Sequence, residues 1–300
     1  IFLVLLLGII SFFAMYSTER GNFGYYTMSH IYRFLTFFLL FIFLSFIKFN
    51  FWHKHAYLFY LFVLILLFAV DFFGITASGS KRWINLFIFN LQPSELMKIT
   101  LIMFLARYYS ERPLHDVNQP KFMILPIFVL FIPVTLVVIQ PDLGTASLIA
   151  AAGLSVVWLA GLRVKFFVYS LITLISFAPV AVSFLRPYQK IRILTFFNPE
   201  RDPLGAGYQI IQSKIAVGSG GIFGKGFLKG SQSYLDYLPE KHTDFIYTLF
   251  SEEFGFMGSM TLLIIYALII YRITLIGTNT RNNFAKLYCY SFASAFFVYV

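Results

Sequence analysis

The 300-residue sequence has little charge. Only 12% of its residues are Asp, Glu, Lys or Arg, about half of the roughly 25% that is usual in soluble domains. A surface in contact with water needs more charge than this, so the composition excludes an ordinary soluble protein. Hydrophobic residues make up 59% of the chain and the mean hydropathy is +0.78. This apolar content also excludes intrinsic disorder.

Cysteine is nearly absent. Cys289 is the single one, so the chain cannot form an internal disulfide and is not a disulfide scaffold. Aromatic residues are abundant instead, with 39 Phe and 19 Tyr, too many for one soluble core of this size. The sequence therefore predicts an integral membrane protein.

Acidic residues are fewer than basic ones, 13 against 23, which gives a net charge of +10. Basic loops of membrane proteins lie against anionic lipid leaflets. We therefore expect membrane lipid, and no nucleic acid, to be the partner of this positive charge.

Nine apolar runs follow one another along the chain. A bilayer core of about 30 Å needs roughly 20 apolar residues, and about 17 are tolerated. The sequence therefore predicts an all-α, polytopic membrane protein in which residues 1–300 form a single transmembrane domain of about nine spans. Apolar residues at both ends of the sequence predict that the domain is truncated there. The predicted spans are 1–17, 32–47, 56–73, 94–110, 122–139, 146–161, 166–185, 256–276 and a ninth that begins near residue 284.

The loops between these runs alternate in basic charge. By the positive-inside rule the more basic set is cytoplasmic, so the first span runs outward. The basic residues of this set are Lys48, Lys54, Arg107, Arg112, Lys121, Arg163, Lys165, Arg272, Arg281 and Lys286. The other set carries only Arg20, Arg33, Lys81 and Arg82.

One connection, 186–255 between the seventh and eighth spans, is much longer than the others. Loops beyond about 12–15 residues are usually functional or disordered. This one combines apolar side chains with a dense set of glycines between Gly205 and Gly230, which permit tight turns. We expect a large, folded extracytoplasmic loop that carries the active site.

A first polar cluster consists of Lys81, Arg82 and Trp83, at a predicted external membrane edge. Two cations beside an interfacial tryptophan suit a phosphate or pyrophosphate headgroup. An ordinary aromatic belt with snorkelling cations explains the same residues.

A second cluster contains Glu95 and Lys98, which enter a predicted span after Pro93. Residues three apart share a helix face, so the two side chains are expected to pair. Ionisable groups inside a span are costly and are functional candidates by default. A structural ion pair between helices is the alternative.

A third cluster contains Gln140 and Asp142, between two predicted spans. Asp is a good helix N-cap, and a helix start also offers N–H groups to an anion. Both a capping role and a site role are compatible with this spacing.

The richest cluster lies between Tyr237 and Phe256. A carboxylate at a boundary between water and an apolar region is placed where its pKa can rise toward that of a general base. We expect this for Asp244, and two further carboxylates about two helical turns later are predicted to approach the same face. Helix capping by Asp244 is the alternative. The polar residues of this cluster are Glu240, Lys241, His242, Asp244, Glu252 and Glu253.

The sequence shows no nucleophile–base triad, no phosphate-binding glycine motif and no paired-cysteine metal site. A divalent cation, Mg²⁺ or Mn²⁺, held by carboxylates and a substrate pyrophosphate is compatible with it but not required.

Five strings, in this order along the whole chain, resemble the shape, elongation, division and sporulation family. They are GSKRWINL, QPSELMK, QPDLGT, FFNPERDPLGAGYQIIQSKIAVGSGGIFGKG and LPEKHTDFIYTLFSEEFGFMG. The segments QSKIAVGSGG and GKGFLKGSQSYLDYLPEKHTDF are more similar to the elongation members than to the division members. Members have ten spans, which implies that the end of the ninth and a tenth are missing here.

The resemblance implies a peptidoglycan glycosyltransferase in the bacterial cytoplasmic (inner) membrane. Such an enzyme polymerises lipid II at the outer face, beside a class B penicillin-binding protein and the other proteins of the elongation machinery. Asp244 matches the family's essential aspartate, and Lys98, Asp142 and Trp83 match functionally important positions.

In that reaction the acceptor 4-hydroxyl attacks the donor's anomeric carbon with inversion, and undecaprenyl pyrophosphate leaves. Asp244 is the expected base, and cations are needed to neutralise the leaving group. The candidates for this are Lys98, which we favour, and Lys81, Arg82, Arg192 and Arg201.

Two other functions remain open at this point. A lipid II flippase requires a polar path through the membrane, but the predicted spans 122–139, 146–161 and 166–185 carry no charge. A non-catalytic scaffold of the elongation machinery leaves the intramembrane charges of Glu95 and Lys98 unexplained.

Overall fold

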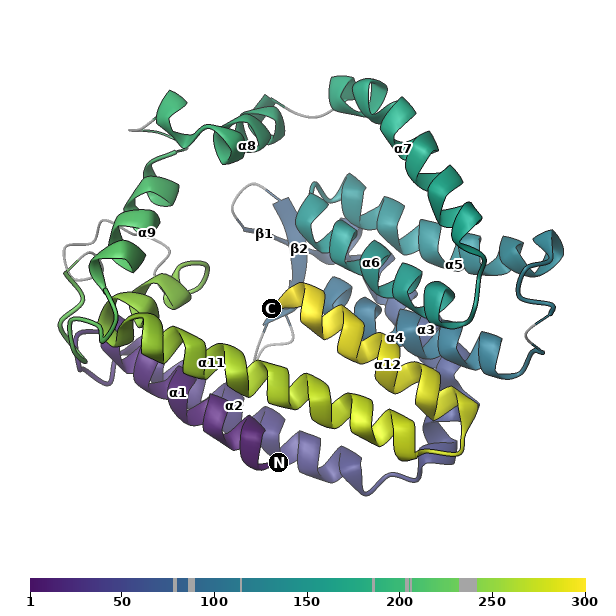
Figure 1. Cartoon of the computed structure of the whole chain (residues 1–300), viewed down its shortest axis with the longest axis horizontal. Helices are drawn as coiled ribbons and strands as arrows, with labels where there is room; N and C mark the ends of the chain where they lie inside the picture. Colours follow the sequence, from purple (N-terminus) through teal and green to yellow (C-terminus); the bar gives the residue numbers. More distant parts are fainter. Residues whose placement is uncertain are drawn as a thin grey trace. The chain divides into compact units, whose positions relative to one another are not determined.

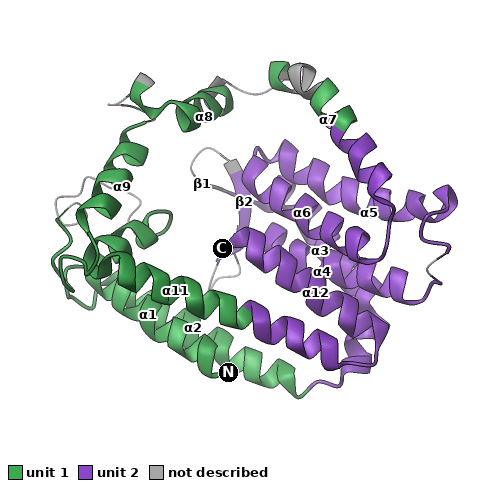
Figure 2. Ribbon diagram, in the orientation of Figure 1, with its two compact units in different colours: residues 1–46, 172–269 green, residues 47–171, 270–300 purple. Residues whose placement is uncertain are grey.

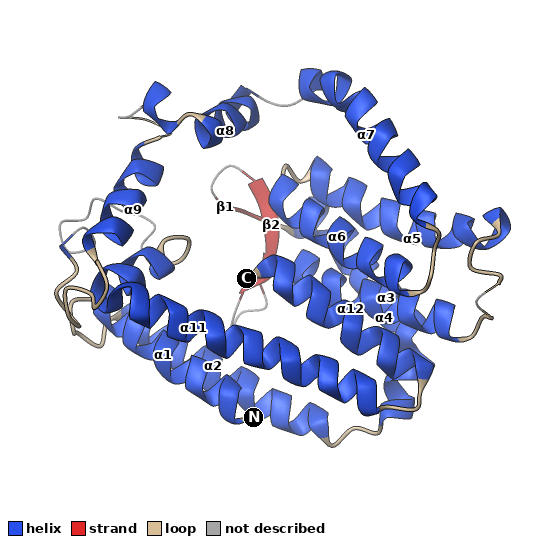
Figure 3. Ribbon diagram, viewed as in Figure 1, coloured by secondary structure: helices blue, strands red, loops and turns tan. Residues whose placement is uncertain are grey.

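The computed structural model describes residues 1–77, 80–85, 90–113, 115–184, 187–202, 205, 207–231 and 242–300. The described chain is mostly helical (Figures 1 and 3). Its helices are α1 (Phe2–Thr18), α2 (Tyr25–Ser45), α3 (Phe49–Phe73), α4 (Pro93–Ser110), α5 (Pro120–Ile139), α6 (Leu143–Leu159), α7 (Val164–Phe184), α8 (Pro187–Phe197), the 3₁₀ helix η1 (Pro199–Arg201), α9 (Tyr208–Ser219), α11 (Ile246–Asn279) and α12 (Asn283–Tyr299).

Each of the nine predicted apolar runs coincides with a helix. By length and composition, α2, α3, α5 and α11 are suited to cross a membrane, and α1, α6 and the Val164–Thr173 part of α7 are shorter apolar helices. These helices indicate a multi-pass membrane protein. The number of spans stays a prediction.

A small antiparallel sheet between α3 and α4 departs from the all-α prediction (Figure 3). Its strands are β1 (Ile75–Ala77), β2 (Ser80–Asn85) and β3 (Asn90–Leu91), in the order β1-β2-β3. Ile75 pairs with Trp83, and Ile84 pairs with Leu91. Ile and Trp are good strand formers, but such short strands give no clear periodicity. The sheet places the cations Lys81 and Arg82 on β2.

The chain divides into two compact units (Figure 2). Unit 1 comprises Ile1–Phe46 and Ile172–Ile269, and unit 2 comprises Ile47–Leu171 and Ile270–Val300.

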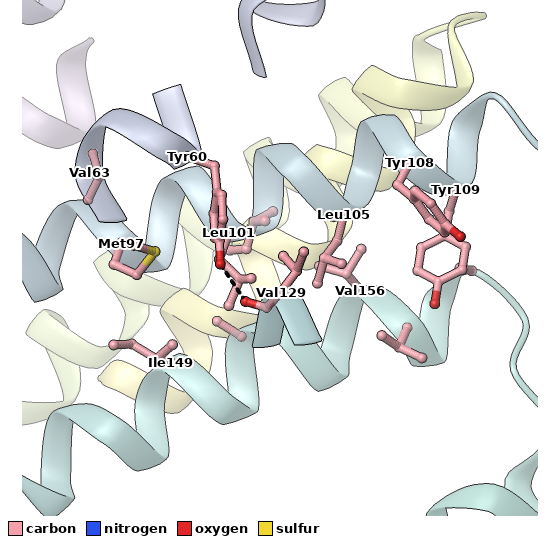
Figure 4. Close-up of a cluster of buried hydrophobic side chains, with 14 of the residues drawn as sticks. Tyr60, Val63, Met97, Leu101, Leu105, Tyr108, Tyr109, Val129, Ile149 and Val156 are labelled. Carbon is pink, nitrogen blue, oxygen red and sulfur yellow. Dashed lines mark hydrogen bonds between the residues drawn. The ribbon is translucent and has the colours of Figure 1, made fainter. Parts of the chain in front are cut away.

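Helix α4 lies at the centre of unit 2, where it packs against α3, α6 and α12. Its side chains Met97, Leu101 and Leu105 are fully buried, and Ile149 of α6 is buried in the same cluster (Figure 4). Leu67 of α3 is also buried in this cluster. The N-terminal part of α4, which carries Glu95 and Lys98, is therefore held by a packed core.

Two prolines inside α5 each leave a helix carbonyl without its usual donor, because proline has no N–H. Pro133 frees the carbonyl of Val129, and the Tyr60 hydroxyl of α3 donates to it at 2.8 Å (Figure 4). Pro126 likewise frees the carbonyl of Phe122, four residues earlier, and the Tyr108 hydroxyl of α4 donates to this carbonyl at 3.0 Å. Side chains of neighbouring helices thus supply a hydrogen-bond donor to both freed carbonyls, as an apolar environment requires.

In unit 1, α11 is kinked at Gly255, whose φ of 64° and ψ of −161° are not helical. Just after the kink, the N–H groups of Phe256 and Met257 donate to the carbonyls of Gly221 and Ile222 at 2.9 and 3.0 Å. The glycine-rich segment that follows α9, residues 220–230, therefore forms backbone hydrogen bonds with α11 at the kink of this helix.

The same segment also satisfies carbonyls just before the kink. The Lys225 and Gly226 N–H groups donate to the carbonyls of Glu252 and Glu253, each at 3.0 Å. A Cβ at Gly255 would collide with the backbone of the glycine-rich segment, and its positive φ disfavours any other residue.

The predicted long loop 186–255 is partly helical in its described residues. It contains α8, η1 and α9, and α11 already begins at Ile246. Glu252 and Glu253 consequently lie on a helix and not in a loop. The extracytoplasmic position of this segment stays a prediction.

Removing the Tyr60 hydroxyl tests the role of tyrosine at a proline break. We expect Tyr60→Phe to lower the free energy of unfolding by about 1–3 kcal/mol, because it leaves the buried Val129 carbonyl unsatisfied. In a Pro133→Ala background the restored N–H serves that carbonyl, so the same substitution should cost less. Unfolding in detergent of the two single variants and the double variant measures the coupling.

Tyr271→Phe is the control, since Tyr271 is 60% exposed on α11. If Tyr60→Phe lowered the free energy of unfolding equally with Pro133 and with Pro133→Ala, the hydroxyl would not act through the proline break.

Candidate functional site

The predicted site residues are divided between the two units. In unit 2, Lys98 Nζ lies 2.8 Å from Glu95 Oε2. The Lys98 side chain is 13% exposed and that of Glu95 44%. The predicted pairing is confirmed, and it leaves the carboxylate the more accessible partner.

Lys98 also contacts an aromatic ring. Its Nζ lies 4.4 Å from the ring centroid of Tyr299, at the end of α12, which is a favourable cation–π distance. Both residues line a cavity of about 210 Å³ between α4, α6 and α12, together with Glu95, Leu148 and Phe296. The cavity is mainly apolar, with one charged pair in its wall.

A second group in unit 2 lies where β2 approaches the start of α6. Asp142 is the N-cap of α6, and its Oδ1 accepts from the Thr145 N–H at 3.1 Å. Its Oδ2 lies 3.5 Å from Arg82 Nη1, and Arg82 Nη2 donates to the Pro141 carbonyl at 2.7 Å. The predicted cap is thus confirmed, and the same carboxylate pairs with a predicted anion-binding cation.

Gln140 is buried and holds this turn to α3. Its amide donates to the Leu67 carbonyl at 3.1 Å and to Asp71 Oδ1 at 3.2 Å. The sequence analysis missed Asp71. A lone carboxylate inside the predicted span 56–73 is the signal that identifies it.

Of the other predicted cations, Lys81 is exposed on β2 beside the half-buried Trp83. Arg192 lies on α8 and Arg201 ends η1, and their side chains lie outside the described part of the structure. Glu240 and Lys241 are outside the described residues as well.

In unit 1, Asp244 is exposed in the turn 242–245 that leads into α11. His242, two residues earlier, stacks on the ring of Tyr26 with centroids 4.0 Å apart and an interplanar angle of 10°. Its Nδ1 lies 2.8 Å from the Thr18 hydroxyl oxygen. The turn that carries Asp244 is thereby attached to the last residue of α1 and the first turn of α2, which together with the residues between them (18–26) are called the α1–α2 connection.

Glu252 and Glu253 are buried, in contrast to Asp244. Glu252 Oε1 lies 2.6 Å from Lys225 Nζ and accepts from the Ser231 hydroxyl at 3.0 Å. The Ser17 hydroxyl of α1 donates to Glu253. These partners hold both carboxylates in the interior of unit 1.

That these two carboxylates approach the face of Asp244 stays a prediction. They lie within α11 and are 0% and 1% exposed, whereas Asp244 is exposed in the turn before this helix. The spacing of these residues along the helix does not identify Lys225 and Ser17, which are distant in sequence and provide the bonding partners.

The described residues contain no group of three or more His, Cys, Asp or Glu side chains that is arranged to hold a metal ion. The carboxylates instead bond Lys225, Ser17, Arg82 and Lys98.

Comparison with known proteins places this arrangement in a family. The cell cycle protein family model for FtsW, RodA and SpoVE matches residues 1–300. Peptidoglycan glycosyltransferase MrdB of Escherichia coli K12 is 42% identical over 244 residues, which cover 80% of this chain and 65% of MrdB. This chain therefore spans less than two thirds of the length of MrdB.

A probable peptidoglycan glycosyltransferase FtsW of Buchnera aphidicola (Schizaphis graminum) is 37% identical over 260 residues, covering 87% of this chain and 72% of that protein. A chain in a solved peptidoglycan synthase complex, described for the coordination of polymerization and crosslinking, superposes with a TM-score of 0.81 and 30% identity, covering 98% of this chain and 82% of that chain. The chain belongs to the family of cell cycle proteins that comprises FtsW, RodA and SpoVE.

Proposed function

We propose that this protein is a peptidoglycan glycosyltransferase that polymerises lipid II into glycan strands during cell elongation. The 42% identity to a protein named as such an enzyme supports the reaction class. Within the structure, the observation that carries the proposal is Asp244, an exposed carboxylate on a turn fixed by its neighbour His242.

Asp244 is proposed to act as the general base. The reaction forms a bond between the acceptor 4-oxygen and the donor's anomeric carbon, while the bond from that carbon to the pyrophosphate oxygen breaks. The hydroxyl proton passes to the carboxylate, which must be reachable by a sugar in water. The exposed position of Asp244 meets this requirement, whereas the buried Glu252 and Glu253 do not.

The leaving group carries away a pyrophosphate charge that cations must stabilise. Lys98 is the proposed residue, because its ammonium lies in the wall of a mainly apolar cavity where electrostatic interactions are strong. Its partner Glu95 is 44% exposed, so an anion can compete for the ammonium. Arg82, fixed by Pro141 and Asp142, is a second candidate.

The proposed partner is a class B penicillin-binding protein in the cytoplasmic membrane. The similarity to a chain of a peptidoglycan synthase complex that coordinates polymerization and crosslinking supports this partner. Lipid II is the proposed substrate, and the apolar helices hold the chain in the membrane that contains it.

Replacement of Asp244 by Asn tests the base. Asn keeps the size of the side chain but cannot accept the proton. Because a general base contributes about 10²–10⁴-fold in rate, we expect Asp244→Asn to lose strand synthesis to that extent. The measurement is polymerisation of labelled lipid II in detergent by the full-length protein with its partner, with crosslinking blocked by a β-lactam.

Glu200→Gln is the matched control, since Glu200 is an exposed carboxylate on η1 in the same unit and should be dispensable. Full activity of Asp244→Asn would remove the residue as base. A wild-type complex that makes no strands in detergent, but moves lipid II across vesicle membranes, would identify a flippase.

Replacement of Lys98 by Met tests the stabilisation of the leaving group. Methionine keeps the length and apolar character of the side chain and removes the charge. We expect a loss of at least about 10²–10³-fold in polymerisation with nearly unchanged protein level. Lys286→Met, an exposed lysine at the start of α12, is the control. An active Lys98→Met variant would show that the ammonium is not needed.

A further inference from the structure

The turn that carries Asp244 is attached to the rest of unit 1 through His242. The imidazole ring lies parallel to the ring of Tyr26, at 4.0 Å and 10°, and its Nδ1 bonds the Thr18 hydroxyl at 2.8 Å. One contact fixes the plane of the ring and the other fixes its rotation within that plane. With both in place, the backbone two residues before Asp244 has little freedom.

The direction of the Thr18 bond follows from its other partner. The Thr18 hydroxyl donates its proton to the Met15 carbonyl at 2.7 Å, so its oxygen is left to accept from His242. Nδ1 of His242 therefore carries a proton. Thr18 is only 3% exposed, and exclusion of water strengthens this hydrogen bond.

Tyr26, the stacking partner, is fixed in turn by Glu19. The Glu19 carboxylate accepts from the N–H groups of Tyr26 and Thr27 at 3.0 and 2.8 Å, in the first turn of α2. Burial acts to raise the pKa of Glu19, but the hydrogen bonds from Thr27 and Tyr26 outweigh it and hold this pKa below its usual value. The carboxylate thus stays ionised and keeps the start of α2 in place.

We infer that the α1–α2 connection is a positioning device for the catalytic base. This inference depends on the proposed function of Asp244 as base. Thr18 and Tyr26 hold His242, and His242 fixes the turn from which the Asp244 carboxylate reaches the acceptor hydroxyl. Thr18, Tyr26 and His242 are positioning residues, because the base acts on the substrate and they act on the base.

The size of the effect follows from the geometry of proton transfer. A base must lie within hydrogen-bond reach of the proton that it removes, and a displacement of 1 Å costs about 10²-fold in rate. Asp244 itself is exposed, so packing around its own side chain contributes little to its position. On its N-terminal side the turn is restricted by the contacts of His242. On its C-terminal side the Phe245 carbonyl accepts from the Thr248 and Leu249 N–H groups of α11.

The test removes each contact separately and then restores it. Tyr26→Leu removes the stacked ring and Thr18→Val removes the hydrogen-bond acceptor. We expect each to lower kcat for lipid II polymerisation by about 10²-fold while KM stays within about twofold. Tyr26→Phe and Thr18→Ser keep the ring and the hydroxyl, so they should restore kcat. Tyr32→Leu, a change at a tyrosine of the same helix that is 64% exposed, is the control.

A second comparison asks whether the contacts act through the base. In an Asp244→Asn background, where no base remains to be positioned, Tyr26→Leu should lower the residual rate by less than about twofold. An undiminished loss in that background would show that Tyr26 acts on the enzyme by another route and would overturn the inference.

A measurement that does not use activity examines the position of the turn directly. A spin label on Asp244→Cys in the full chain reports local mobility. Mobility should rise when Tyr26→Leu or Thr18→Val is added and should stay unchanged with Tyr32→Leu. An unchanged label, or a mobile label with normal kcat, overturns the inference. If the wild-type complex makes no strands, the proposed function fails, and the label still decides whether the connection holds residue 244.

Discussion

Polar backbone groups inside an apolar helix bundle have no water to bond, so any break in a helix must be satisfied by another part of the protein. Pro133 breaks the hydrogen-bond pattern of α5, and the Tyr60 hydroxyl donates to the Val129 carbonyl that this proline leaves without a donor. Gly255 breaks α11, and the glycine-rich segment after α9 supplies both donors and acceptors there. In each unit this requirement determines which distant segment lies against which helix.

The same constraint governs the charged side chains. Lys98 pairs with Glu95, Arg82 with Asp142 and Glu252 with Lys225. The Glu252 side chain is fully buried, whereas that of Lys225 is 29% exposed. This pair fixes the glycine-rich segment on α11, and the buried carboxylate is unsuited to proton transfer with a sugar. Asp244, in contrast, is exposed on a turn held by His242. The carboxylate that a substrate can reach is therefore a different one from the buried carboxylates that stabilise the fold.

The sequence predicts those features that depend on neighbours along the chain. Apolar runs gave the positions of the helices, and the three-residue spacing of Glu95 and Lys98 gave their pairing. The remaining features depend on contacts between segments far apart in sequence. The bond from Ser17 to Glu253 joins residues 236 positions apart, and no local pattern encodes it. The short strands β1–β3 were missed because two to six residues show no decisive alternation.

The arrangement of charge is also compatible with the proposed inverting transfer from a lipid carrier. Such a reaction needs a base for a hydroxyl in water and a cation for a pyrophosphate at the end of a lipid. An apolar cavity wall is a favourable place for the cation, since its field is weakly screened there, and Lys98 occupies one. It is a poor place for the base, because burial would protonate the carboxylate. The proposed base, Asp244, lies on an exposed turn instead, so its proposed positioning relies on neighbours such as His242 and not on burial of its own side chain.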